Sequence, residues 1–249
     1  MNYIQITEEN LEEEHICCAI SNNKDPQVMA KKAWMRERIK EGLVFLKGDI
    51  RGKCFIEYIP AECAWVPILA EGYIHINCFW VSGSCKGQGY ANDLLNQCIA
   101  DAKQKGKIGL TVITSAKKKS FLSDPKYLAY KGFRRADAAE PYFELWYLPF
   151  EEQAEMPQFR ECAKHPRCDG KGFVLYYTGG CPFTAKYVPL LKQWAKEREV
   201  PLTAVEIDSA EAAQKAPAVW TNYALFYDGE YVTHEILSEK KFHALVLQC

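Results

Sequence analysis

Hydrophobic and polar residues follow one another along the chain in two successive blocks, and each block predicts a mixture of strands and helices. In the first block the nearly continuous apolar stretch Tyr73–Val81 predicts a buried strand. A helix is predicted for Ala91–Lys105, because its apolar residues recur at helical spacing and form one face. These apolar residues are Ala91, Leu94, Leu95, Cys98, Ile99 and Ala102.

The other elements of the first block are predicted from alternation and from local end signals. Pro26–Glu41 is expected to be a helix, because Asp25 is a favoured N-cap residue and Pro26 suits the first helical position. The remaining expected elements are strands at Tyr3–Ile6, His15–Ile20, Leu43–Ile50, Cys54–Ile59, Ile108–Thr114, Phe133–Ala136 and Tyr142–Leu148, a hairpin turn at Arg51 and Gly52, and a short helix at Phe121–Lys131.

A polar segment separates the two blocks. Residues 151–172 contain Pro157 and Pro166 and show no sustained period, which is typical of a linker or a surface connection. We therefore expect one domain at residues 1–150 and a second at residues 173–249. The expected elements of the second domain are strands at Phe173–Thr178, Leu202–Ile207, Tyr223–Tyr227 and Tyr231–Ile236, a helix that ends near Glu199, and a helix at Glu239–Leu247.

Composition and charge narrow the class of protein. Hydrophobic residues make up 48% of the 249 residues and charged residues 25%, which is typical of a well-packed globular protein. The net charge is −1, and neither block has the basic excess that nucleic-acid binding normally requires, so we expect no nucleic-acid partner.

The compartment is inferred from the N-terminal residues and the cysteines. The acidic start resembles no secretion signal, and no apolar run approaches the roughly 18 residues of a membrane span. The 11 cysteines are odd in number and irregularly spaced, which favours reduced thiols. We therefore expect a cytoplasmic protein with no membrane partner.

A glycine-rich loop joins the buried strand to the helix that follows it. Gly83, Gly87 and Gly89 let the backbone approach a ligand closely. The first turn of the helix presents N–H groups without intrahelical partners, which together with the helix dipole suit a pyrophosphate. Lys86 adds a positive charge. A tight turn without a ligand stays an alternative, whereas the G-x-G-x-x-G spacing of a dinucleotide site is absent.

The residues of this loop resemble the pyrophosphate loop of the GCN5-related N-acetyltransferase (GNAT) family. Gly89 and Ala91 occupy its two small positions, and Lys86 replaces the usual Arg or Gln. The resemblance continues through Ile108–Thr114, the strand that separates from its neighbour in this family, and through Phe121–Phe133, which ends in the family's Gly-Phe pair. The full loop reads Lys86, Gly87, Gln88, Gly89, Tyr90 and Ala91.

The resemblance implies a GNAT-type α/β fold, with a mixed central sheet and flanking helices, and acetyl-CoA as cosubstrate. The loop N–H groups from Gly87 to Ala91 would hold the CoA pyrophosphate. The main chain of Phe79, Trp80 and Val81 would pair with the pantetheine arm. Lys117–Lys119 would meet the 3′-phosphate, unless this charge run is only a solvated loop.

The candidates for the catalytic acid and base lie outside the glycine-rich loop. Many family members place a tyrosine four residues before the glycine of Gly-Phe, but Leu128 stands there, so Tyr127 and Tyr130 are the candidates for the acid. Glu57 is the candidate general base, because its strand should border the substrate cleft; a solvent-exposed strand residue is the alternative. His75 is expected to be a core or rim histidine rather than a base.

The second domain offers one thiol of interest. Cys181 precedes a helix that Pro182 begins, and a thiol at a helix N-terminus is expected to ionise more easily. The sequence Cys-Pro-Phe-Thr lacks a second cysteine, which excludes a dithiol cycle. The element order resembles a small thioredoxin-like domain. Cys162, His165 and Cys168 are a weak zinc pattern with no second ligand pair, so no metal is assigned.

Together the two blocks resemble the bacterial YoaP-type acetyltransferases over nearly the whole chain. We therefore predict an N-acetyltransferase that transfers an acetyl group from acetyl-CoA to a primary amine of a small molecule or peptide. Two alternatives remain: a thiol-dependent redox or sensing protein that uses Cys181, and a CoA-binding module without turnover. The sequence does not indicate the acceptor or the oligomeric state.

Overall fold

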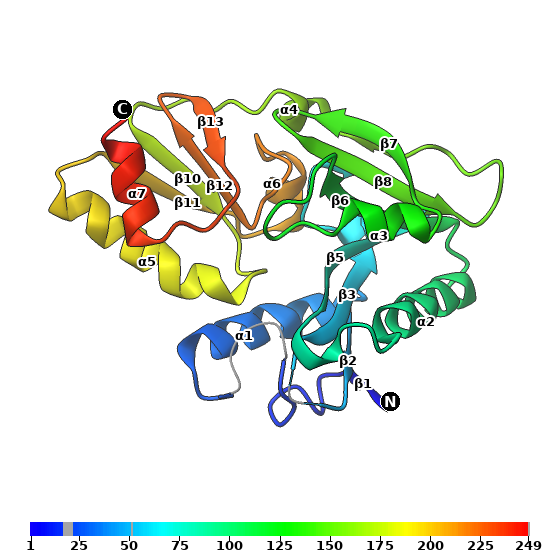
Figure 1. Cartoon of the computed structure of the whole chain (residues 1–249). Helices are drawn as coiled ribbons and strands as arrows, with labels where there is room; N and C mark the ends of the chain where they lie inside the picture. The colour runs from blue at the N-terminus through cyan, green and yellow to red at the C-terminus, as the bar shows by residue number, and fades with distance from the viewer. Residues whose placement is uncertain (17–21, 51, 249) are drawn as a thin grey trace.

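The computed structural model describes residues 1–16, 22–50 and 52–248. Two large sheets organise these residues, one in the N-terminal part of the chain and one in the C-terminal part (Figure 1), and a third sheet has only two short strands. The expected strand at His15–Ile20 and the turn at Arg51 and Gly52 include residues outside the described ones.

Strands and helices alternate along the chain, and each of the longer ones overlaps a predicted element. The strands are β1 (Tyr3–Ile6), β2 (Val44–Gly48), β3 (Cys54–Pro60), β4 (Ile68–Leu69), β5 (Tyr73–Val81), β6 (Gly109–Ser115), β7 (Arg134–Ala139), β8 (Phe143–Pro149), β9 (Gln158–Phe159), β10 (Phe173–Tyr177), β11 (Leu202–Glu206), β12 (Tyr223–Tyr227) and β13 (Glu230–Thr233). The α-helices are α1 (Pro26–Lys40), α2 (Tyr90–Gln104), α3 (Pro125–Tyr130), α4 (Glu161–Lys164), α5 (Pro182–Glu197), α6 (Ala210–Gln214) and α7 (Glu239–Val246), and the 3₁₀ turns are η1 (Ala61–Cys63) and η2 (Gly83–Cys85).

One helix begins later than predicted. α3 starts at Pro125 instead of Phe121, because the side chain of Asp124 caps it by accepting a hydrogen bond from the N–H of Lys126. Phe121 lies outside the helix with φ 65°, in the left-handed region.

The central sheet of the N-terminal part has the strand order β1-β2-β3-β5-β6-β8-β7. All neighbouring strands are antiparallel except β5 and β6, which run parallel. The β5–β6 pairing ends with Ile76 opposite Val112, although β5 continues to Val81 and β6 to Ser115. The two middle strands therefore separate, as the family resemblance implied, and the mixed α/β fold class is confirmed.

Each face of this sheet has its own hydrophobic core, because side chains along a strand point alternately to opposite faces. On β3, Ile56 and Tyr58 pack with α2 and α3 on one face, which we call the α2 face. Phe55 and Ile59 pack with Val28 and Met35 of α1 on the other face, which we call the α1 face. Glu57 lies between Phe55 and Ile59 in the strand, so its side chain is on the α1 face.

The segment predicted as a linker is folded against the N-terminal part. β9 pairs with β4, and Phe159 and Ala163 are completely buried in the core of the α1 face. The sequence predicted neither β9 nor α4, because each is too short to show a period.

The C-terminal part, which we call the C-terminal unit (residues 173–248), is a four-stranded sheet with the order β11-β10-β12-β13. β10 and β11 are parallel, whereas β12 and β13 are antiparallel to their neighbours. α5 and α7 pack on one core of this sheet with Phe173, Leu191 and Phe242.

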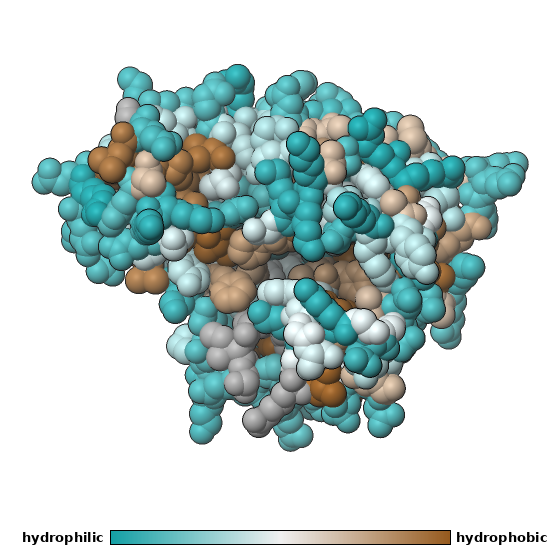
Figure 2. Space-filling view, viewed as in Figure 1, coloured by the Kyte–Doolittle hydropathy of each residue, from teal (hydrophilic) through white to brown (hydrophobic). Residues whose placement is uncertain are grey.

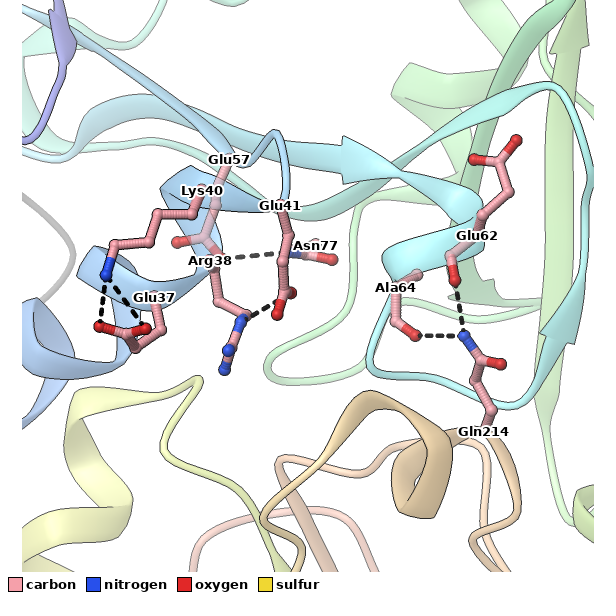
Figure 3. A network of polar contacts seen from close by, with 9 residues as sticks. All are labelled: Glu37, Arg38, Lys40, Glu41, Glu57, Glu62, Ala64, Asn77 and Gln214. Atoms are coloured by element: carbon pink, nitrogen blue, oxygen red, sulfur yellow. Dashed lines mark hydrogen bonds and ion pairs between the residues drawn. The ribbon is translucent and has the colours of Figure 1, made fainter.

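The C-terminal unit packs on the α1 face. α1 and α5 lie side by side (Figure 1). A Cβ atom on Gly179 would lie 3.0 Å from the indole of Trp34, so the backbone before α5 approaches α1 closely. Gln214 donates hydrogen bonds to the carbonyl oxygens of Glu62, at 2.9 Å, and Ala64, at 3.3 Å (Figure 3). Among the described residues no helix is long and apolar enough to cross a membrane.

Candidate active site

A cavity of about 710 Å³ extends from the glycine-rich loop to the C-terminal unit. Its lining includes Lys86 and Tyr127 on the α2 face, Glu57 on the α1 face, and the segments 180–183 and 220–223 of the C-terminal unit. Because residues from both faces line it, the cavity passes through the sheet where β5 and β6 separate. Figure 2 shows side chains of intermediate to high hydropathy in the hollow between the C-terminal unit and the part that contains α1.

The loop before α2 has the geometry of an anion-binding site. Gly87 has φ 75° and Gly89 φ 84°, and a Cβ atom on either would have no atom within 4 Å. The left-handed backbone, rather than lack of space, therefore requires glycine at these positions. Among the hydrogen bonds of the described residues, none uses an N–H group of residues 87–91 as donor. These N–H groups at the α2 N-terminus suit a pyrophosphate.

The exposed edge of β5 leads from this loop into the sheet. A register shift between Glu57 and Tyr58 leaves Asn77 without an opposite residue on β3, and such a bulge increases the local twist. In the described part of the chain, no strand pairs with Phe79–Val81 on the β6 side. Its backbone groups on that side are therefore available to an extended ligand. The loop and this edge fit the pyrophosphate and the pantetheine arm of CoA.

Glu57 is buried at the centre of a polar cluster, so the alternative of a solvent-exposed strand residue is wrong. Its carboxylate lies 2.7 Å from the Lys31 ammonium and accepts a hydrogen bond from Asn77 at 3.3 Å (Figure 3 shows the latter). Lys31 also donates to the carbonyl oxygen of Gly180 at 2.7 Å. The cluster thus joins α1, β3, β5 and the start of α5.

The two tyrosine candidates have different surroundings. Tyr127 lines the cavity, its ring packs edge-on against Phe79, and its hydroxyl donates to Asn92 at 3.2 Å. Burial raises the pKa of Tyr127 to about 12. Tyr130 is 78% exposed and does not line the cavity, and Leu128 is fully buried in the core of the α2 face.

His75 is a buried histidine, as expected. Its Nδ1 lies 3.0 Å from the Thr111 hydroxyl, and burial lowers the pKa of His75 to about 3, so the ring is neutral. Of the three consecutive lysines, Lys118 and Lys119 line the cavity and Lys117 does not. Lys118 pairs with Asp124 at 2.9 Å.

The expected easy ionisation of Cys181 is wrong. Burial raises the pKa of Cys181 to about 11, an effect larger than the opposing hydrogen bond from the backbone of Phe183 and the nearby charge of Lys31. Cys181 is the N-cap residue of α5 and lines the cavity near Glu57. Its thiol is therefore uncharged at physiological pH.

The described residues contain no group of three metal-ligating side chains arranged to hold an ion. His165 instead pairs with Glu140 at 3.1 Å, and the Cys162 thiol lies 3.8 Å from the carbonyl oxygen of Gln214. All the cysteines that the structure describes are free thiols.

Sequence reasoning missed the residues that close the cavity on the α1 face. Lys31 and Trp34 come from α1, Trp65 from the loop after η1, and Trp220 and His234 from the C-terminal unit. No local pattern identifies them, because only the packing of the C-terminal unit on α1 brings them together.

Two family models match the chain. The model of the GNAT acetyltransferase family matches residues 9–120, and the model of YoaP-like proteins matches residues 201–243. A curated protein is similar over nearly the whole length: the uncharacterized N-acetyltransferase YoaP of Bacillus subtilis (strain 168) is 43% identical over 247 residues, which are 99% of this chain and 98% of that protein.

The chain therefore belongs to the GNAT family of N-acetyltransferases, whose cosubstrate is acetyl-CoA. Within this family it is a relative of YoaP and carries the YoaP-like C-terminal segment.

Solved structures of GNAT acetyltransferases are also similar to parts of the chain. One from Staphylococcus aureus has a TM-score of 0.42 and 15% identity, and the match covers 60% of this chain and 99% of that one. Another, from Brucella melitensis in complex with acetyl-CoA, has a TM-score of 0.37 and 19% identity, with 64% and 92% covered.

Proposed function

We propose that the protein transfers the acetyl group of acetyl-CoA to a primary amine of a small molecule or peptide that binds on the α1 face. The observation that carries the proposal is the continuity of the cavity. It joins the loop at Lys86 and Ala91 and the free edge of β5 to Glu57 on the other face of the sheet. A thioester that enters along β5 would thus meet an amine near Glu57.

The side chains of the cavity can supply the proton transfers that this reaction needs. Glu57 accepts the proton that the attacking amine loses, directly or through a water molecule, while the C–N bond forms. Tyr127 donates its hydroxyl proton to the CoA thiolate as the C–S bond breaks. The raised pKa of Tyr127, about 12, keeps that proton in place at neutral pH.

The C-terminal unit is proposed to be a thioredoxin-like domain that forms a wall of the acceptor site. Its strand order, with one parallel pair and two antiparallel pairs, supports the first part of this proposal. The contacts of Gly180 and Cys181 with the Lys31–Glu57 cluster support the second. Thiol catalysis is the less favoured function, because the raised pKa of Cys181 leaves little of the reactive thiolate at neutral pH.

The division into residues 1–150, 151–172 and 173–249 also stays a proposal. The separate hydrophobic core around Phe173, Leu191 and Phe242 supports the last boundary.

The proposal is tested by measuring CoA thiol release from acetyl-CoA with a panel of primary amines, together with mass spectrometry of the product. We expect release that depends on the amine and a product heavier by one acetyl group. Tight binding of acetyl-CoA without release for any amine or peptide would support a CoA-binding module without turnover and would contradict the proposal.

A further inference from the structure

The cavity contains a cation without a carboxylate partner on its α1 face. Four lysines line the cavity: Lys31, Lys86, Lys118 and Lys119. Lys31 pairs with Glu57 and Lys118 with Asp124, whereas Lys86 belongs to the loop that suits the CoA pyrophosphate. Among the ion pairs of the described residues none includes Lys119, whose ammonium lies 3.9 Å from the centre of the Tyr142 ring. Lys119 is half-buried.

The C-terminal unit holds the backbone next to Lys119 in place. His234 is buried, and its Nε2 donates to the carbonyl oxygen of Ser120 at 2.8 Å. Its Nδ1 accepts from the Tyr142 hydroxyl at 2.6 Å. Burial lowers the pKa of His234, which keeps the ring neutral and able to donate at one nitrogen while it accepts at the other. Lys119 is therefore positioned on the acceptor side, beside residues of the C-terminal unit.

Six aromatic side chains also line this end of the cavity. Phe121, next to Ser120, has φ 65° and is 44% exposed. A bulky residue in the left-handed region is strained, and such strain often accompanies a binding site. Aromatic walls suit a flat or apolar ligand body. The aromatic side chains that line this end are Trp34, Trp65, Phe121, Phe183, Trp220 and Tyr223.

We propose that the acceptor is a small zwitterionic amine, of the amino-acid class, with an apolar or aromatic side chain. Its amino group faces Glu57, its carboxylate pairs with Lys119, and its side chain packs against the aromatic walls. This inference rests on the proposed function and specifies its substrate. A polyamine fits less well, because the lining carries four lysines against the carboxylates of Glu57 and Asp124. The amine of a protein lysine has no carboxylate beside it for Lys119 to bind.

The test compares amino acids with the amines that lack their carboxylate. Phenylalanine, tryptophan, leucine and methionine are assayed beside phenethylamine, tryptamine, isoamylamine and 3-(methylthio)propylamine, by CoA release and by calorimetry in the presence of CoA. The variant is Lys119→Gln, and the matched control is Lys240→Gln, which changes an exposed lysine of α7 outside the cavity. We expect Lys119→Gln to raise KM for the preferred amino acid by about 10- to 100-fold, the size of a charge-assisted hydrogen bond. KM for the matching amine should be unchanged in Lys119→Gln, and KM for both substrates should be unchanged in Lys240→Gln.

Two outcomes would overturn the inference and leave the proposed function intact. In one, the wild type acetylates the amines as well as the amino acids. In the other, Lys119→Gln changes KM equally for both members of a pair. In a third outcome acetyl-CoA binds, but neither the amino acids nor the amines cause CoA release, and no amino acid binds by calorimetry. The inference is then wrong. Acetylation of an unrelated amine or peptide would show that the proposed function nevertheless holds.

Discussion

The two ends of the cavity are built in different ways. The end at the glycine-rich loop, which is the proposed cofactor end, comes almost entirely from one continuous run of chain, β5, this loop and α2, with Tyr127 added from α3. The opposite end, which is the proposed acceptor end, is assembled from α1, β3, the loop after η1, the loop before α3 and three segments of the C-terminal unit. The geometry of a continuous run is set mainly by its local sequence, whereas an assembled site changes whenever one contributing segment changes. Specificity is therefore expected to reside at the acceptor end.

The largest effect is expected from a charge at the cofactor end. In Ala91→Glu a carboxylate enters the first turn of α2, where it stabilises the helix but repels a pyrophosphate. Like charges in contact cost several kcal/mol, so the Kd for acetyl-CoA should rise by about 100-fold or more. Isothermal titration calorimetry measures this Kd. The control Asn96→Glu, on an exposed position of the same helix, should bind normally. Equal Kd values for the two variants would remove the loop from the binding site.

The second-largest effect is expected from a change in the Lys31–Glu57 cluster, where the two ends of the cavity meet. Glu57→Gln should lower kcat by about 100-fold or more, the usual contribution of a general base. It also leaves the buried Lys31 ammonium without its carboxylate, which should destabilise the fold by about 3–5 kcal/mol. Denaturant unfolding and steady-state kinetics measure the two effects.

A double variant separates these two roles of Glu57. Lys31→Met combined with Glu57→Gln removes both charges, so most of the lost stability should return while turnover stays low. Recovery of turnover together with stability would mean that Glu57 is only a structural partner of Lys31.

A smaller effect is expected from Tyr127→Phe, because a thiolate leaves readily even without an acid. We expect kcat to fall by about 10- to 100-fold, and Tyr130→Phe to have no effect, since Tyr130 is exposed outside the cavity. Because the pKa of Tyr127 is raised to about 12, its proton is lost only as the pH approaches that value. The wild-type kcat should therefore show no alkaline decline due to this group below about pH 10. A decline near pH 8 that disappears in Tyr127→Phe would contradict this.

The smallest effect concerns Cys181. With its pKa raised to about 11, very little of this thiol is ionised at pH 8, so iodoacetamide should modify the exposed Cys162 several-fold faster. Peptide mass spectrometry over time measures both rates. Cys181→Ala should bind acetyl-CoA normally. Faster modification of Cys181 would revive the thiol-dependent alternative.

The local backbone at the proposed cofactor end could be predicted from the sequence, because its signals are local. The spacing of Leu94, Leu95 and Cys98 defines the buried face of α2, and Gly87 and Gly89 have the backbone conformation for which glycine is needed. The separation of β5 from β6 followed only from the family resemblance.

The acceptor end could not be predicted, because its contacts join distant residues. The sequence around Lys31 predicts a solvent-exposed residue of a polar helix. The structure instead buries Lys31, which contacts Glu57 and Gly180. The thiol prediction failed for a similar reason: the helix N-terminus next to Cys181 is visible in the sequence, but the packing that desolvates the thiol is not.

The cavity is proposed to carry the thioester through the sheet to the acceptor side. A crystal structure of the acetyl-CoA complex tests this claim most directly. We predict that the pyrophosphate lies on the N–H groups of residues 87–91, the pantetheine arm runs along Phe79–Val81, and the acetyl group points through the gap between β5 and β6 toward Glu57. A pyrophosphate bound elsewhere, or an acetyl group that stays on the α2 face away from Glu57, would contradict the claim.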